Sequence, residues 1–207
     1  MKIKDIDGFF AALDQRAQVP LKVIITGGAA AIIFGGSRAT QDIDFEIQFK
    51  VKASKKKNDQ WAEIQHHLNE VVRLTQIVAQ YSDDIDRWSS IPMPSKKSKR
   101  YKKIGKIEVH ILDVGLWCIG KLTRYLATDI EDLTQVLTLV KRNAVSLAKL
   151  WGQALGISAP SPAQTNFRRN VYNFFDTSTE KIWGGKADSE KLKKIFLIAA
   201  TSSRRSS

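Results

Sequence analysis

The chain has 207 residues, of which 43% are hydrophobic and 26% charged, so it can bury one folded core and carry a helical appendage. Lysine and arginine outnumber aspartate and glutamate by 33 to 21, and the net charge of +12 favours polyanionic partners, nucleic acid first. The longest apolar stretch, residues 23–36, is interrupted by Thr26 and four glycines and is too short to cross a bilayer. No signal-peptide core opens the chain, and the single cysteine, Cys118, excludes an internal disulfide and is expected to serve packing. We therefore expect a cytoplasmic protein without membrane contact.

The first third of the chain alternates between helix and strand patterns. Residues 3–17 predict a helix whose apolar face consists of Ile6, Phe9, Phe10 and Leu13. Residues 21–25 predict a strand that ends at the glycine pair Gly27-Gly28, and the small residues up to Phe34 predict a short helix that packs closely on a sheet. A glycine pair between a strand and a helix exposes backbone N–H groups to which phosphate oxygens can bind, although such pairs are also common in turns.

Acidic and apolar residues alternate from Asp42 to Ile47, which predicts a half-buried strand. Its apolar members, Ile43, Phe45 and Ile47, would face the core, and Asp42, Asp44 and Glu46 would share the other face. At a rise of about 3.3 Å per residue, Asp42 and Asp44 lie roughly 6.6 Å apart along that face. Two carboxylates at this separation can bind a hard cation between them. The alternative is an acidic face that is only solvated.

The middle of the chain predicts one long helix and one irregular segment. The helix would begin at Asn58-Asp59 and run to about Tyr81. Residues 82–103 predict a strand around 86–89 and then a basic loop. In this loop six cationic residues surround Tyr101, namely Lys96, Lys97, Lys99, Arg100, Lys102 and Lys103. Basic residues around an aromatic ring suit a nucleic-acid strand, and a solvated lysine loop is an equal alternative.

A second alternating strand covers residues 104–112, with Ile107, Val109 and Ile111 on one face and Glu108 and His110 on the other. The rest of the chain predicts helices: residues 116–126, a helix opened by Asp129, another at about 143–155, and one or two over residues 164–207. Residues 157–162 are typical of a linker.

The order of these motifs resembles the nucleotidyltransferase superfamily, in which a Gly-Gly or Gly-Ser pair is followed, after roughly a dozen residues, by Asp-x-Asp on a strand. Here Gly27-Gly28 and Asp42-Ile43-Asp44 are separated by 13 residues. The motif Gly-x-x-Arg-x-Thr-x-Asp-Ile-Asp, from Gly35 to Asp44, is similar to that of the abortive-infection and toxin branch of this superfamily. The resemblance covers residues 20–135.

The resemblance implies an α+β (α/β) fold, with a small mixed sheet flanked by helices and a helical C-terminal region. The catalytic domain would be residues 1–113 and the helical region residues 114–207. A third carboxylate arrives on a neighbouring strand in the superfamily; Glu108 is the matching residue and Asp113 the reserve. The resemblance thus implies that Asp42, Asp44 and Glu108 are catalytic and bind Mg²⁺ or Mn²⁺.

The nucleotide side of the implied site consists of residues that would contact the triphosphate of an NTP: Gly27, Gly28, Ser37, Arg38 and Lys121. Lys121-x-x-Arg124 followed by Asp129-x-x-Asp132 is also similar to the toxin branch, although Asp129 fits a plain N-cap equally well. One departure has two interpretations. Ala29, Ala30 and Ala31 stand where the family has Ser or Thr, so either NTP binding is weaker or Ser37 substitutes from the second glycine turn.

Three functions are therefore hypotheses. The first is a metal-dependent nucleotidyltransferase that moves an NMP from an NTP to RNA, with tRNA as a candidate, in the role of a toxin with an antitoxin partner. The second is transfer to a protein or a small molecule such as an aminoglycoside; the net charge of +12 argues against a small basic acceptor. The third is a catalytically silent nucleic-acid-binding module, favoured by the alanines after Gly28 and opposed by the retention of three carboxylates.

Overall fold

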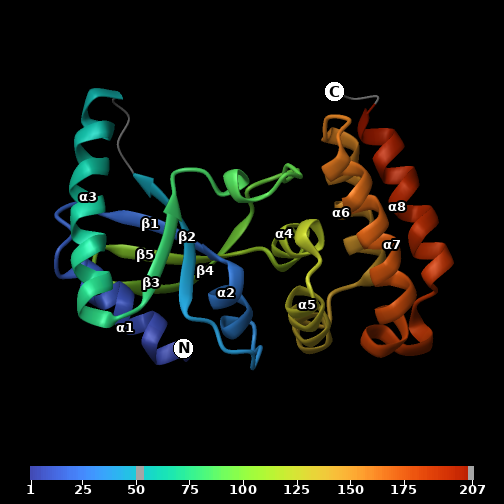
Figure 1. Ribbon diagram of the computed structural model, residues 1–207, viewed down its shortest axis with the longest axis horizontal. Coiled ribbons are helices and arrows are strands. Elements are labelled where there is room, and N and C mark those ends of the chain that lie inside the picture. The colour runs from blue at the N-terminus through green and yellow to red at the C-terminus, as the bar shows by residue number, and fades with distance from the viewer. Residues whose placement is uncertain (50–53, 205–207) are drawn as a thin grey trace. The chain divides into compact units, whose positions relative to one another are not determined.

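The computed structural model describes residues 1–49 and 54–204 of the chain (Figure 1). Its internal contacts divide it into two compact units. The sheet unit contains residues 1–33, 37–85 and 98–112, and the helical unit contains residues 34–36, 86–97 and 113–207. The helical unit therefore includes two short segments that come from within the predicted catalytic domain, in addition to the expected C-terminal region.

The sheet unit is built on five strands in the order β3-β2-β1-β5-β4. Strand β1 (Leu21–Thr26) pairs antiparallel with β2 (Asp42–Phe49) and parallel with β5 (Ile107–Leu112). Strand β3 (Val78–Ser82) is parallel to β2, and β4 (Ser98–Ile104) is antiparallel to β5. This mixed sheet with flanking helices, followed by C-terminal helices, confirms the predicted fold class.

One face of the sheet is apolar and forms the core with α1 (Ile3–Asp14) and α3 (Ser54–Thr75). The rings of Phe9 and Phe10 lie 6.0 and 5.4 Å from the ring of Phe45, centre to centre. Trp61 of α3 contacts Phe49 at 5.7 Å. The predicted inward residues of α1 and β2 are all buried, namely Ile6, Phe9, Phe10, Leu13, Ile43, Phe45 and Ile47. Burial of these aromatic and aliphatic side chains stabilises the unit through the hydrophobic effect.

Three predictions in the middle of the chain are wrong. Helix α3 begins at Ser54 and ends at Thr75, because Gln76 adopts a left-handed φ of +57° and the next residues form β3 beside β2. The strand expected around 86–89 is a short 3₁₀ helix, η1 (Ile85–Trp88). Most of the expected basic loop is the edge strand β4. Residues 50–53 lie outside the described residues.

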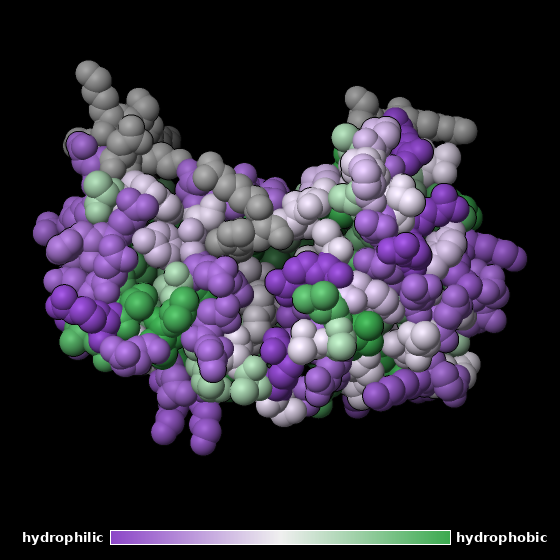
Figure 2. All heavy atoms as spheres, in the orientation of Figure 1, coloured by the Kyte–Doolittle hydropathy of each residue, from purple (hydrophilic) through white to green (hydrophobic). Residues whose placement is uncertain are grey.

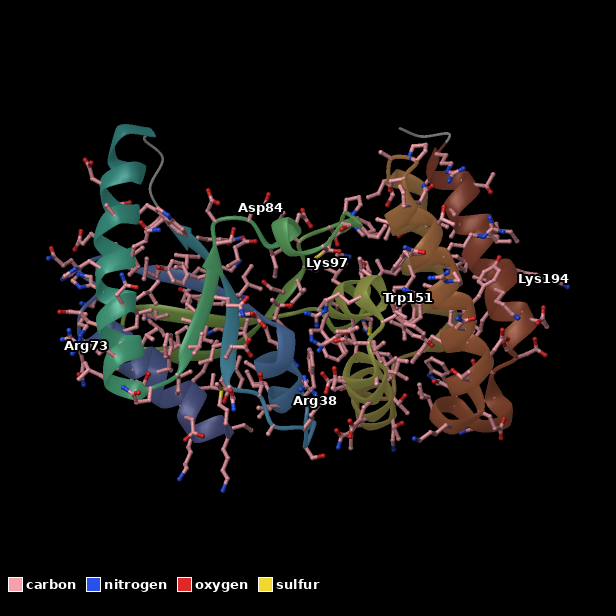
Figure 3. All side chains as sticks on the ribbon, viewed as in Figure 1. Arg38, Arg73, Asp84, Lys97, Trp151 and Lys194 are labelled. Carbon is pink, nitrogen blue, oxygen red and sulfur yellow. The ribbon has the colours of Figure 1, made fainter. Side chains whose placement is uncertain are left out.

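The helical unit is formed by α4 (Val114–Arg124), α5 (Ala127–Val140), α6 (Ala144–Ile157), α7 (Pro162–Trp183) and α8 (Ser189–Arg204), with a short 3₁₀ turn η2 (Gly184–Lys186) before α8. Trp151 lies among these helices (Figure 3) and its indole N–H donates to the carbonyl of Gly115 at 3.0 Å. A Cβ at Gly152 or Gly156 would lie 2.3 or 2.4 Å from a carbonyl oxygen of α8. These two glycines allow α6 and α8 to pack backbone against backbone.

None of the described helices is long and apolar enough to cross a membrane. The visible surface is largely hydrophilic (Figure 2), and exposed large apolar side chains such as Leu74 of α3, Leu139 of α5 and Ile198 of α8 occur on different helices. Cys118 is fully buried in α4, and its burial raises the pKa of the thiol well above its ordinary value. The expectation that this cysteine serves packing is consistent with that position.

Candidate functional site

The glycine pair and the acidic pair meet at one end of the sheet. Strand β1 ends at Thr26, which pairs with Asp44 of β2, and α2 (Gly27–Ile33) begins at the next residue. Gly27 has a φ of +60°, and a Cβ built on it would lie 1.7 Å from Oδ2 of Asp44. The missing side chain is what lets the Asp44 carboxylate lie against the backbone at this turn. Two motifs that are separate in the sequence therefore form one constellation.

Asp42 is oriented by two neutral donors. The Thr40 hydroxyl donates to its Oδ1 at 2.6 Å, and the Gln80 side-chain amide donates to its Oδ2 at 3.1 Å. Thr40 in turn lies against Gly28, where a Cβ would be 2.7 Å from Oγ1 of Thr40. Hydroxyl and amide donors hold a carboxylate in place without neutralising its charge.

Thr40 and Gln80 are site residues that the sequence interpretation does not identify. Thr40 belongs to the Arg-x-Thr-x-Asp motif, so a signal for it is present in the chain. Gln80 carries no signal, because its segment is predicted to be helical and its position opposite Asp44 depends on the pairing of β3 with β2.

Glu46, the third acidic residue of β2, is 2% exposed. Its Oε2 accepts the backbone N–H of Ile85 at 2.8 Å, and its Oε1 accepts the side-chain amide of Gln48 at 2.5 Å. This carboxylate anchors the chain after β3 and satisfies its buried oxygens internally. Glu46 is therefore not part of an open acidic face, whereas Asp42 and Asp44 are only half-buried.

The strand register separates Glu108 from the acidic pair. Glu108 pairs with Lys22 of β1, whereas Asp44 pairs with Thr26, four residues further along the same strand. This offset corresponds to about 13 Å along the sheet, with two strand spacings of about 4.8 Å across it. On its other side Glu108 pairs with Lys103 of β4. This geometry corrects the prediction that Glu108 completes a metal site with Asp42 and Asp44. Glu108 instead lies in a cross-strand row between two lysines, where opposite charges stabilise the sheet.

The reserve candidate, Asp113, has a structural role as well. Its Oδ1 accepts the N–H of Gly115 at the start of α4 at 2.9 Å, and its Oδ2 lies 2.9 Å from Nη2 of Arg142. Within residues 1–49 and 54–204, no group of three or more histidine, cysteine, aspartate or glutamate side chains is arranged to hold a metal ion.

Lys121 belongs to a buried ion network in the helical unit. Its Nζ lies 3.0 Å from Oδ1 of Asp129 and 2.7 Å from Oδ2 of Asp132, and its side chain is 3% exposed. Arg124 lies 2.8 Å from the same oxygen of Asp129. Asp129 is the third residue of α5 and Leu126 is the N-cap, so the N-cap assignment for Asp129 is wrong. These contacts join α4 to α5, and a phosphate could reach Lys121 only by displacing both carboxylates.

Ser37 and Arg38 lie in the segment that leads from α2 to β2. Ser37 is exposed, and Arg38, labelled in Figure 3, donates from Nη1 to the carbonyl of Ala39 at 3.3 Å. Their contribution to phosphate binding stays a prediction.

The edge strand β4 divides its basic residues between the two faces. A register shift between Arg100 and Lys102 puts Arg100 opposite His110 and Lys103 opposite Glu108, on the polar face. On the other face Lys102 forms an ion pair with Asp7 at 2.7 Å, and the Tyr101 hydroxyl donates to Asp7 at 3.2 Å. Burial, followed by the Asp7 charge, raises the pKa of Tyr101. Tyr101 therefore helps to hold α1 against the sheet. The sequence prediction instead places its ring in a basic loop, where it would stack on a nucleic-acid strand.

Comparisons with protein-family models, with curated proteins and with solved structures give no match for this chain. The chemistry of the site accordingly rests on its own residues. Mg²⁺ in nucleotide enzymes is commonly bound by one or two carboxylates, with substrate phosphates and water completing its octahedron. Asp42 and Asp44, on one face at the end of the sheet, fit this kind of site. A metal site built from three protein carboxylates does not fit the described residues.

Proposed function

We propose that the sheet unit binds an NTP as its Mg²⁺ complex at Asp42 and Asp44, and that the protein transfers the NMP to a nucleic-acid acceptor. The observation that carries the proposal is the contact between Gly27 and Asp44, which joins a bare backbone turn to a carboxylate. The resemblance to nucleotidyltransferases and the net charge of +12 support the reaction type and an RNA acceptor.

In the proposed reaction an acceptor hydroxyl oxygen forms a bond to the α-phosphorus, the bond to the bridging oxygen of the β-phosphate breaks, and pyrophosphate leaves. Mg²⁺ supplies neutralisation of the triphosphate charge and polarisation of its oxygens when it is bound. Thr40 and Gln80 hold Asp42 in one orientation, and Gly27 lets Asp44 approach the turn. Glu108 takes no part, so the hydroxyl proton passes to solvent.

The test uses purified protein, Mg²⁺, each α-labelled NTP in turn and total cellular RNA. We expect label on RNA with the wild type and with Glu108→Gln, and a loss of at least about 100-fold with Asp44→Asn, because the charge that binds the metal complex is removed. Equal labelling by wild type and Asp44→Asn would contradict the proposal. Label on protein in place of RNA would identify a protein acceptor.

A silent nucleic-acid-binding module is the second candidate. It is favoured by one observation, the displacement of Glu108 from the acidic pair, because superfamily members that transfer nucleotides use a third carboxylate. This candidate expects RNA binding with no label on any acceptor and no Mg²⁺-dependent NTP binding. A toxin role and an antitoxin partner rest on the resemblance and stay predictions.

A further inference from the structure

The helical unit contains a pocket of its own, with a volume of about 680 Å³, between the α5–α6 turn and the α7–α8 connection. This volume lies in the range of small-molecule sites. Its rim carries six charged or aromatic side chains: Lys141, Arg142, Trp183, Lys186, Asp188 and Lys191. They come from the end of α5, the end of α7, the η2 turn and the start of α8.

The rim keeps an excess of positive charge. Asp188 is the one carboxylate among the described lining residues, and its Oδ1 accepts the backbone N–H of Lys191 at the start of α8 at 2.6 Å. Arg142 is partly neutralised by Asp113 at 2.9 Å. Lys141, Lys186 and Lys191 are exposed, and within the described part of the chain their ammonium groups have no hydrogen-bond or ion-pair partner. Three such ammonium groups around one hollow favour a phosphate-bearing ligand.

The pocket also offers a flat apolar surface. The indole N–H of Trp183 donates to the carbonyl of Arg142 at 2.8 Å, which fixes the ring between the end of α7 and the α5–α6 turn. Gly184, the next residue, has φ +58° and ψ −157°, a conformation that only glycine adopts readily, and it turns the chain toward Lys186. Leu192 and Ala144 line the interior and are buried. An aromatic ring with cationic neighbours is the arrangement that binds nucleobases together with their phosphates.

We propose that this pocket binds a nucleotide unit, with its base against Trp183 and its phosphate among Lys141, Lys186 and Lys191. A free mononucleotide and a nucleotide within an RNA strand present the same chemistry, and the experiment distinguishes them. Binding in this pocket does not require Asp42 or Asp44, so its test is independent of the transferase proposal.

The experiment measures binding of AMP by calorimetry and of a fluorescein-labelled oligouridylate by anisotropy, with the full chain in EDTA so that metal-dependent binding at Asp42 and Asp44 is silent. The pocket variant is Lys186→Ala/Lys191→Ala. The matched control is Lys149→Ala/Lys194→Ala, which removes the same charge from exposed positions outside this pocket; Lys194 points outward from α8 in Figure 3. Trp183→Leu tests the base contact, and thermal unfolding verifies that each variant folds.

We expect the pocket variant to weaken binding about tenfold. The slope of log affinity against log salt concentration should fall by the amount that corresponds to about two phosphate contacts, and the control should change affinity less than about threefold. Trp183→Leu should also weaken binding about tenfold, with no change in salt dependence. Binding of both probes assigns the pocket to nucleotides in general, binding of AMP alone assigns it to a free mononucleotide, and binding of the oligouridylate alone assigns it to an RNA strand. Equal losses in the pocket and control variants, or no binding of either probe by the wild type, would overturn the proposal.

Discussion

The two units each contain a pair of aspartates that the sequence presents in similar ways, and the structure gives them opposite environments. Asp129 and Asp132 are each 1% exposed and are matched by Lys121 and Arg124. The sheet unit's Asp42 is half-buried and accepts hydrogen bonds from neutral groups. Cations balance the buried aspartates of the helical unit, whereas the neutral donors that hold Asp42 leave its charge available to a ligand. The burial and the partners of an aspartate, more than its spacing from the next one, therefore decide whether it is open to a cation.

The greatest loss of stability is expected when Lys121, the lysine between Asp129 and Asp132 of the helical unit, is replaced. Lys121→Met leaves two buried carboxylates, with Arg124 still beside Asp129, and we expect the free energy of unfolding to fall by about 3–5 kcal/mol. Urea denaturation measures this loss. Lys149→Met, at an exposed position on α6, is the matched control and should change stability by less than about 0.5 kcal/mol. A Lys121→Met protein as stable as this control would mean that the ion network is not structural.

A smaller loss is expected where the sheet unit's pair meets the glycine turn. Gly27→Ala puts a side chain on a backbone with φ +60° and into the Asp44 carboxylate, so we expect a loss of about 1–3 kcal/mol. It should also abolish Mg²⁺-dependent NTP binding by displacing Asp44. Gly8→Ala is the control, because a Cβ there meets no atom within 4 Å and the position is helical. Normal NTP binding by Gly27→Ala would show that this contact does not shape the site.

The least change is expected at Glu108, a carboxylate to which the sequence resemblance assigns a catalytic role. Glu108→Gln removes a charge between Lys22 and Lys103, and cross-strand pairs of this kind contribute about 0.2–1 kcal/mol. We expect a stability loss of that size in urea denaturation and NTP binding within about twofold of the wild type. A loss of NTP binding as large as that caused by Asp44→Asn would contradict this expectation and would mean that Glu108 takes part in the metal site.

Local patterns are sufficient to predict the strands and helices whose apolar faces repeat regularly. The alternation in β2 and β5, the apolar run of β1 and the helical stripe of α1 identify the buried residues, because these patterns depend on neighbours in the chain. The glycine and aspartate motifs also predict the constellation around Gly27 and Asp44, since β1 and β2 are consecutive strands that pair directly.

Non-local pairing accounts for the features that local patterns do not predict. Ile77 and Val78 continue the apolar stripe of α3, and only the turn at Gln76 and the pairing with β2 make this segment a strand. The place of Glu108 depends on the register of β5 against β1, which no local signal encodes. The resemblance assigns Lys121 to phosphate. Local patterns do not reveal its carboxylate partners, because these lie on the next helix and are buried only when α4 packs on α5.

The decisive measurement is calorimetric binding of each NTP in Mg²⁺ by the wild type, Asp44→Asn and Glu108→Gln, with EDTA as the metal-free reference. We predict Mg²⁺-dependent binding that Asp44→Asn removes and Glu108→Gln retains, with the unfolding transitions of all three proteins intact. Binding that survives Asp44→Asn, or that requires Glu108 as much as Asp44, would contradict the assignment of the metal-nucleotide site to the acidic pair of β2.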